Sequence, residues 1–175
     1  MKIYKRAVLP SGFKASAVSC GIKKSGRPDL ALMYSKPAAS AACLFTVNKV
    51  KAAPVIVCKR LLKKGVSFNA IIANSGNANC FTGRYGIRAA EETIAYLARE
   101  LSLKKENILV ASTGIIGRRL PVEKIKKSIP VLVDKLSFFG INDAKKAIMT
   151  TDTFPKEISV KFVIGKKEIC VCAVA

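Results

Sequence analysis

The sequence has 175 residues, of which half are apolar, and its formal net charge is +20. This length is enough for one domain with a sizeable core, and the apolar content excludes a disordered chain. We therefore expect a single domain over residues 1–175. The chain contains no histidine. Its own residues therefore cannot assemble a Ser-His-Asp or Cys-His catalytic group or a His-ligated metal site, and we expect no metal.

The positive charge is spread in short lysine pairs, such as Lys23-Lys24 and Lys126-Lys127, and no run reaches five like charges. Few aromatic residues lie between the pairs, which argues against a nucleic-acid-binding arm and favours lysines on solvated faces. A non-catalytic basic protein that binds nucleic acid or an acidic partner stays open as the alternative. The basic segment Met1–Pro10 lacks the apolar core of a signal peptide, and the nearly uncharged stretch Pro37–Asn48 is too short to span a bilayer.

The six cysteines form no Cys-x-x-Cys pair, which disfavours a zinc ribbon or a thioredoxin-like redox site. Most of them lie in apolar runs, so we expect small buried hydrophobes with reduced thiols, as in a cytosolic protein. Cys170 and Cys172 alternate with Val171, which places both on one face of a strand.

The first half of the chain predicts strands over Gly12–Ile22, Leu30–Ser35 and Ala41–Val47, with a Gly- and Pro-containing turn between the first two. The short apolar run Val55–Cys58 can continue into a helix over Lys59–Lys64.

Phe68–Ala73 predicts another strand, and the loop Asn74–Cys80 follows it with three asparagines, a serine and a glycine. Such residues favour local backbone hydrogen bonds and positive φ. The loop is either a polar turn or a recognition loop with many neutral donors and acceptors. Arg84–Leu101 then has apolar residues at helical spacing on one face and predicts the best helix of the chain.

The stretch Ile108–Ala111 is apolar without alternation, which predicts a strand buried on both faces. It runs directly into Ser112-Thr113-Gly114. The N–H of Gly114 beside the Thr113 hydroxyl is suited to hold a developing oxyanion. An ordinary turn after a strand is the alternative.

A second helix starts in Leu120–Glu123, with Pro121 suited to its first turn, and its buried face is marked by Val122, Ile125, Ile129 and Leu132. Pro130 is expected to break or kink this helix. Asn142 or Asp143 can cap a third helix that runs through Met149. A hairpin of Ile158–Ile164 and Glu168–Ala175 follows around Gly165.

Between the third helix and the hairpin lies Thr150-Thr151-Asp152-Thr153, three hydroxyls around one carboxylate. These groups suit an amino-acid ligand, because a carboxylate pairs with an ammonium group and hydroxyls fix its orientation. A helix end passing into a turn is the alternative.

Taken together and in order, these stretches resemble the α chain of ornithine acetyltransferase, also called glutamate N-acetyltransferase, of arginine biosynthesis. The runs that carry the resemblance span nearly the whole chain: Pro10–Phe13, Leu44–Asn48, Ala73–Cys80, Ala111–Gly117 and Ala147–Lys156. The resemblance implies a mixed α/β fold in which sheets and helices are layered, of the ornithine acetyltransferase or N-terminal-nucleophile-like type.

The resemblance also implies a mechanism that needs no histidine. The family's precursor cuts itself before a threonine, which becomes the nucleophile at the N-terminus of the β chain and uses its own α-amine as the base. The acetyl group passes from N-acetylornithine to this threonine and then to glutamate. By the same resemblance, Thr113 and Gly114 match the oxyanion-hole pair and Thr150 matches a substrate-binding threonine.

The family motif that holds the nucleophile follows an Ala-Val-Ala-like strand and is absent from these 175 residues. The resemblance therefore implies activity only with the β chain, in a cytoplasmic assembly of two α and two β chains. It implies no cofactor, no nucleic acid and no membrane, with acetyl-CoA as a further co-substrate in some members. An N-terminal-nucleophile aminopeptidase is a related alternative, but the Asn-rich loop and the Thr-Thr-Asp-Thr run argue against it.

Overall fold

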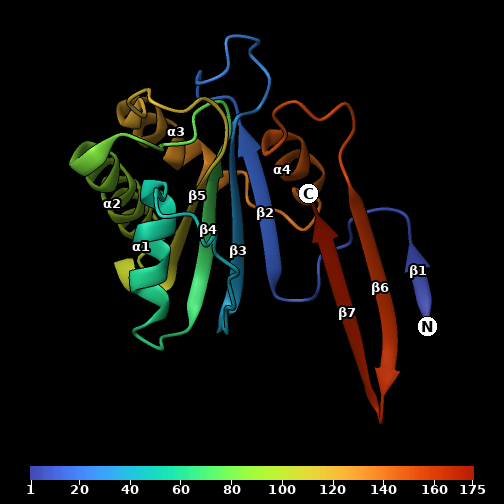
Figure 1. Cartoon of the computed structure of the whole chain (residues 1–175). Coiled ribbons are helices and arrows are strands. Elements are labelled where there is room, and N and C mark those ends of the chain that lie inside the picture. The colour runs from blue at the N-terminus through green and yellow to red at the C-terminus, as the bar shows by residue number, and fades with distance from the viewer.

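The computed structural model describes residues 1–175 as a layered α/β arrangement of two sheets and four helices (Figure 1). The helices are α1 (Ala53–Leu62), α2 (Gly83–Glu100), α3 (Val122–Asp134) and α4 (Ile141–Ala147). The strands are β1 (Lys2–Tyr4), β2 (Phe13–Val18), β3 (Leu30–Ala39), β4 (Phe68–Asn74), β5 (Ile108–Ser112), β6 (Glu157–Ile164) and β7 (Lys167–Val174). A short 3-10 turn, Lys105–Asn107, precedes β5.

The central sheet has the strand order β2-β3-β4-β5. The first three strands are antiparallel neighbours, whereas β4 and β5 pair in parallel. A parallel pair needs a crossover connection, and here α2 supplies it. As a result, the carboxyl ends of β4 and β5 lie side by side, and the chain leaves both strands at the same end of the sheet.

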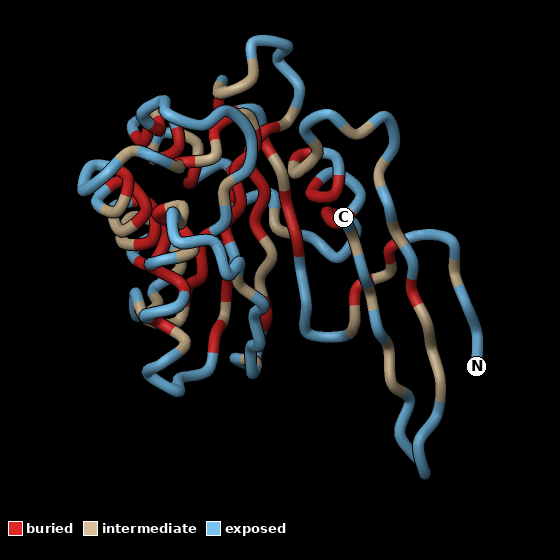
Figure 2. Tube along the Cα trace, in the orientation of Figure 1, coloured by how far each residue is buried: buried red, intermediate tan, exposed pale blue.

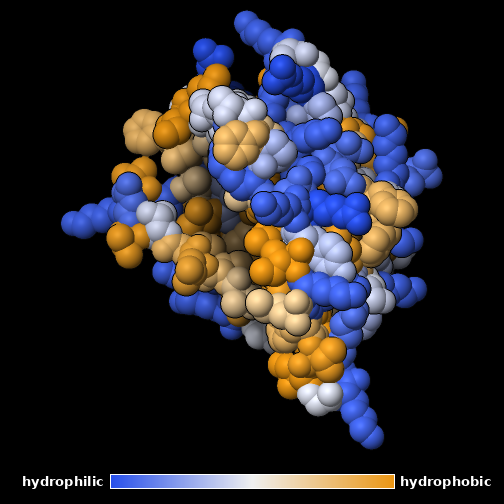
Figure 3. Space-filling model, turned by 90° about the vertical axis from the view of Figure 1, so that its right-hand side faces the viewer, coloured by the Kyte–Doolittle hydropathy of each residue, from blue (hydrophilic) through white to orange (hydrophobic).

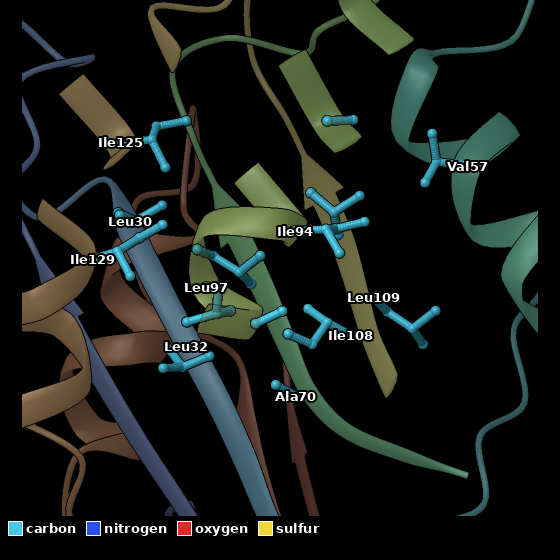
Figure 4. Packing of buried hydrophobic residues seen from close by; sticks show 14 of the residues in the cluster. Leu30, Leu32, Val57, Ala70, Ile94, Leu97, Ile108, Leu109, Ile125 and Ile129 are labelled. Carbon is cyan, nitrogen blue, oxygen red and sulfur yellow. The ribbon is translucent and has the colours of Figure 1, made fainter. Parts of the chain in front are cut away.

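Alternation along β3 builds a separate core on each face of the central sheet. Leu30 and Leu32 point into the larger core, which α1, α2 and α3 cover (Figure 4). Ala31 points the other way, into a smaller core with Ala15 and the apolar side of α4. The small residues on this second face let α4 approach closely, so the sheet is covered on both sides.

The outer sheet, in the order β1-β6-β7, lies beyond α4 (Figure 1). Its hairpin projects away from the rest of the chain and is mostly exposed toward its tip (Figure 2). Hydrophobic and hydrophilic side chains form separate patches on this side of the molecule (Figure 3). The exposed apolar residues of the hairpin include Ile158, Val163, Ile164 and Val171. None of the helices has both the length and the apolar character needed to cross a membrane.

The strand predicted over Ala41–Val47 is not formed, and this segment is irregular. Both edges of β3 are already occupied by β2 and β4, so the residues after β3 have no free edge beside it. Leu44 and Val47 are fully exposed. The run at Val55 belongs to one continuous helix, α1, and the predicted strand Gly12–Ile22 is shorter at both ends.

Two helix predictions need correction. Pro130 does not break α3, which continues past it to Asp134; the proline lies on the exposed side, where the carbonyl freed by its missing N–H can bind water. Neither Asn142 nor Asp143 caps α4; Gly140 occupies that position, and the helix ends at Ala147 instead of Met149. The close contact with β2 explains the glycine, since a Cβ on Gly140 would lie 1.7 Å from the Ala15 carbonyl oxygen.

The cysteine prediction holds only in part. All six are free thiols, but only Cys20 and Cys58 are buried, and Cys43 is exposed. Because Ala41–Val47 forms no strand, Cys43 lies outside both cores. The buried Cys58 thiol donates to the Val110 carbonyl at 3.1 Å.

Candidate active site

The candidate site lies where the chain leaves β4 and β5. The two strands continue to pair past their ends: the Thr113 N–H donates to the Asn74 carbonyl at 3.0 Å, and the Ala78 N–H donates to the Ile115 carbonyl at 3.0 Å. The Asn-rich loop and the Ser-Thr-Gly turn therefore form one unit. Their mutual position is fixed by the parallel pairing of the strands that precede them.

Gly114 occupies a position in this unit that only glycine fits. Its φ is +130°, and a Cβ there would lie 2.4 Å from the carbonyl carbon of Gly76 and 2.6 Å from the Asn77 nitrogen. L side chains rarely adopt this φ, and backbone atoms cannot move aside as a flexible side chain does. Contact with Gly76 and Asn77 thus dictates the residue at the turn.

The turn presents two unused hydrogen-bond donors. Neither the Gly114 N–H nor the Thr113 hydroxyl bonds another group of the chain, and both residues are exposed. Two such donors side by side on a rigid turn are the arrangement that stabilises an oxyanion in acyl transfer.

The loop Asn74–Cys80 is not a recognition loop with free asparagine side chains. The Asn74 and Asn77 side chains donate to the carbonyls of Asn77, Arg118 and Arg119, and the Asn79 amide donates to the Gly86 carbonyl. All three asparagines are buried. Their side-chain amides are already used in hydrogen bonds to backbone carbonyls, so the loop is structural.

Thr150 lies just beyond the end of α4, and its side chain is exposed. The Ser75 hydroxyl, in the Asn-rich loop, donates to the Ala147 carbonyl and so joins that loop to the end of α4. Asp152 is already engaged by another side chain. Its carboxylate pairs with the Lys156 ammonium, which lowers the Asp152 pKa. The predicted set of three hydroxyls around one carboxylate is therefore divided.

Thr113, Gly114 and Thr150 line one cavity of about 810 Å³. The structure thus brings together residues that are separated by more than thirty positions in the sequence. Residues of the β2–β3 connection and of the segment before α3 complete its wall. The remaining lining residues are Gly21, Ile22, Lys23, Lys24, Ser25, Gly76, Asn77, Ile115, Arg118, Arg119, Pro121, Lys124 and Thr151.

The wall of this cavity is strongly cationic. It contains five basic residues and no acidic one, and none of the five forms an ion pair: Lys23, Lys24, Arg118, Arg119 and Lys124. The Arg119 guanidinium lies 5.0 Å from the centroid of the Tyr85 ring. An uncompensated positive wall attracts carboxylates and stabilises negative charge that develops inside the cavity.

Asp29 is a structural residue that the sequence reading assigned only to a turn. It is fully buried, and its carboxylate accepts from the N–H groups of Cys20, Ile22 and Lys23 at 2.6, 2.6 and 2.8 Å. Burial, with the neighbouring Asp29 carboxylate, raises the pKa of the Cys20 thiol to about 12. Cys20 therefore stays protonated and is no nucleophile. A single Asp in a Gly- and Pro-containing turn gives no pattern from which this could be read.

Comparisons with known proteins agree with this arrangement. Residues 14–175 match the model of the ArgJ family. The chain is 50% identical over 161 residues to the arginine biosynthesis bifunctional protein ArgJ of Caldanaerobacter subterraneus subsp. tengcongensis, covering 92% of this chain and 40% of that protein. The chain spans about two fifths of the length of the curated relatives that it matches.

Two solved structures share the fold. The crystal structure of the Bacillus halodurans arginine biosynthesis bifunctional protein ArgJ has a TM-score of 0.92 and 32% identity, covering 99% of this chain and 93% of that chain. The Mycobacterium tuberculosis ornithine acetyltransferase complexed with ornithine has a TM-score of 0.91 and 36% identity, covering 98% and 93%. These matches confirm the predicted mixed α/β fold.

Proposed function

We propose that this chain, which belongs to the ArgJ family, is the α chain of an acetyltransferase of arginine biosynthesis. In this proposal the enzyme transfers acetyl from N-acetylornithine to glutamate through the N-terminal threonine of a β chain. The observation that carries the proposal is the presence of Thr113, Gly114 and Thr150 in the wall of one cavity.

The two free donors account for the first step. When the β-chain threonine oxygen attacks the acetyl carbonyl, the carbonyl oxygen gains negative charge in the tetrahedral intermediate. The Gly114 N–H and the Thr113 hydroxyl then donate to this oxyanion, and the α-amine of the threonine takes the hydroxyl proton. The bond from carbonyl carbon to nitrogen breaks, ornithine leaves with the proton, and acetyl remains as an ester. Attack by the glutamate amine reverses these events.

The Thr150 hydroxyl, which bonds no other group of the chain, is proposed to bind the substrate in the same cavity. The cationic wall supports amino-acid substrates, because N-acetylornithine and glutamate both carry carboxylates. No cofactor is needed for these steps. The proposal includes acetyl-CoA only as a further co-substrate, which would supply acetyl in place of N-acetylornithine.

The proposed partner is the β chain of the same precursor, in a cytoplasmic α2β2 assembly. Support comes from the outer sheet, where β7 has a neighbouring strand on one side only and exposes Val171. A strand edge with free backbone groups and apolar side chains is suited to pair with a strand from another chain.

The test is acetyl transfer by the full-length protein, meaning the α chain together with the β chain of the same precursor, with labelled N-acetylornithine as donor and glutamate as acceptor. We expect labelled N-acetylglutamate from the wild type. Thr113→Ala should lower kcat by roughly 10²-fold, the usual cost of one oxyanion donor, whereas Thr113→Ser keeps the hydroxyl and most of the activity. A wild-type protein that transfers no acetyl group would contradict the proposal, and full activity of Thr113→Ala would remove Thr113 from the mechanism.

A further inference from the structure

Lys23 has a different environment from the other cations of the cavity. Its Nζ donates to the carbonyls of Met149, Pro28 and Ala147 at 2.7, 3.3 and 3.4 Å. An ammonium group has three donors, and these three carbonyls use all of them. The Lys23 ammonium therefore has no donor left for a substrate, although the residue lines the cavity.

The contacts of Lys23 join two distant parts of the chain. Its backbone N–H is held by the buried carboxylate of Asp29 at 2.8 Å, which fixes the β2–β3 connection. Its ammonium binds the last turn of α4 through Ala147 and the residue immediately before Thr150 through Met149. The position of Thr150 thus depends on a lysine 127 residues earlier in the sequence.

The same lysine lies against the unit that contains the Ser-Thr-Gly turn. A Cβ on Gly76 would lie 3.2 Å from Lys23 Cγ, so the Lys23 stem packs on Gly76, which in turn contacts Gly114. Ser75, the residue before Gly76, binds the Ala147 carbonyl that Lys23 also binds. One chain of contacts therefore runs from Gly114 through Gly76 and Lys23 to Met149.

We propose that Lys23 is a positioning residue for acyl transfer, which sets the Thr150 hydroxyl at its distance from the Thr113–Gly114 pair. This inference rests on the function proposed above. Lys23 acts through the Met149 carbonyl and does not itself contact the substrate. A lysine that only contributed charge to the cavity would have a solvated ammonium, as an exposed surface lysine does.

Burial lowers the pKa of the Lys23 ammonium, and the nearby Arg27 adds to this, while Asp29 acts in the opposite direction. The removal from water is compensated by the three carbonyls, and hydrogen bonds from a charged donor are stronger than those between neutral groups. The bridge is therefore costly to remove, because the carbonyls of Ala147 and Met149 would lose a charged partner.

The experiment compares three variants of the full-length protein in the acetyl-transfer assay. Lys23→Met keeps the aliphatic stem on Gly76 but removes the donors, and Lys23→Arg keeps a charged donor. Lys146→Met is the control, because it removes an equal charge from an exposed residue of α4 whose ammonium forms no ion pair. We expect Lys23→Met to raise the KM for N-acetylornithine about tenfold and to change kcat less than about threefold. The KM of Lys23→Arg should lie close to the wild-type value, and the KM and kcat of Lys146→Met should equal those of the wild type.

Hydrogen exchange of the backbone amides of residues 148–153 provides a second measurement that does not depend on activity. We expect faster exchange in Lys23→Met than in wild type and Lys146→Met, with unchanged exchange in the central sheet. Equal KM values together with equal exchange in Lys23→Met and wild type would overturn the inference. An inactive wild type whose exchange still responds to Lys23→Met would instead contradict the proposed function and leave the bridge standing.

Discussion

At the scale of single residues, asparagine and threonine have opposite surroundings at the cavity. Asn74, Asn77 and Asn79 are buried and hydrogen-bonded to backbone groups. Thr113 and Thr150 are exposed, and their hydroxyls bond no other group of the chain. Buried polar side chains are satisfied for structural reasons, whereas free hydroxyls in a cavity wall are available to a ligand. The threonines therefore are the better candidates for chemistry.

Thr150→Val removes the hydroxyl and keeps the shape of the side chain. If this hydroxyl binds the substrate, kcat/KM for N-acetylornithine should fall by an amount equivalent to roughly 1–3 kcal/mol, the cost of a lost polar contact. Thr153→Val is the matched control, since Thr153 is also exposed but does not line the cavity. Steady-state kinetics of both full-length variants give the answer, and equal losses would show that Thr150 has no special role.

The position of the Ser-Thr-Gly turn could be predicted from the local sequence, whereas the contacts that hold it in place could not. A buried strand running into Ser112-Thr113-Gly114 marks a turn with free donors, and its position could be predicted locally. Lys23 and Asp29 were assigned to a turn, because their bonds reach Met149 and the backbone of residues 20–23, and no local pattern encodes such contacts. The Asn-rich loop was ambiguous for the same reason.

At the scale of elements, the close approach of two turns is the feature on which the site depends. The turn after β5 contacts the loop after β4 through Gly114 and Gly76. Parallel pairing of β4 and β5 brings these turns together, and the absence of a Cβ on Gly114 lets their backbones touch.

Gly114→Ala tests this contact, and Gly117→Ala is its matched control. Both glycines have positive φ, at +130° and +78°, but a Cβ on Gly117 would meet nothing within 4 Å. Both variants should show backbone strain, and only Gly114→Ala should add a clash with Gly76. We expect Gly114→Ala to lower the free energy of unfolding by about 2 kcal/mol more than Gly117→Ala, and to abolish acetyl transfer. Urea denaturation of the full-length variants measures the difference, and equal values would show that the turns are free to separate.

Helices and strands were predicted correctly where the hydrophobic pattern was long, or where the paired strands are adjacent in the sequence. The helical spacing over Arg84–Leu101 corresponds to α2, and the hairpin of β6 and β7 lies where the sequence placed it. The failed strand at Ala41–Val47 has adequate β propensity, and it fails because β3 leaves it no edge to pair with. The α4 N-terminus was misplaced because Gly140 is required by a contact with Ala15, which is distant in sequence.

At the scale of the whole molecule, a single ion pair joins α4 to the outer sheet. The Lys145 ammonium lies 2.6 Å from a Glu157 carboxylate oxygen, and the second oxygen of that carboxylate accepts from the Ala7 N–H at 2.6 Å. The side chains are 8% and 18% exposed. One carboxylate thus holds together α4, the start of β6 and the N-terminal segment, which are three separate parts of the layered arrangement.

This pair should make the stability of the protein depend on pH in acid. The Lys145 ammonium and the Ala7 N–H lower the pKa of Glu157 below its value in the unfolded chain. The unfolded chain therefore binds the proton first, so the contribution of Glu157 to stability is complete above a pH of about 4.3 and is lost as the pH falls through the folded-state pKa.

Glu157→Gln should lower the free energy of unfolding by roughly 2 kcal/mol at pH 7, because Lys145 keeps a neutral partner in place of a charged one. Its unfolding free energy should then fall less steeply than that of the wild type as the pH falls from about 5 to 3. Glu168→Gln, which removes the exposed carboxylate beside Lys161, should leave both the stability and its acid dependence nearly unchanged. Urea denaturation of the full-length proteins across this pH range measures both effects, and parallel curves for wild type and Glu157→Gln would show that another group controls unfolding in acid.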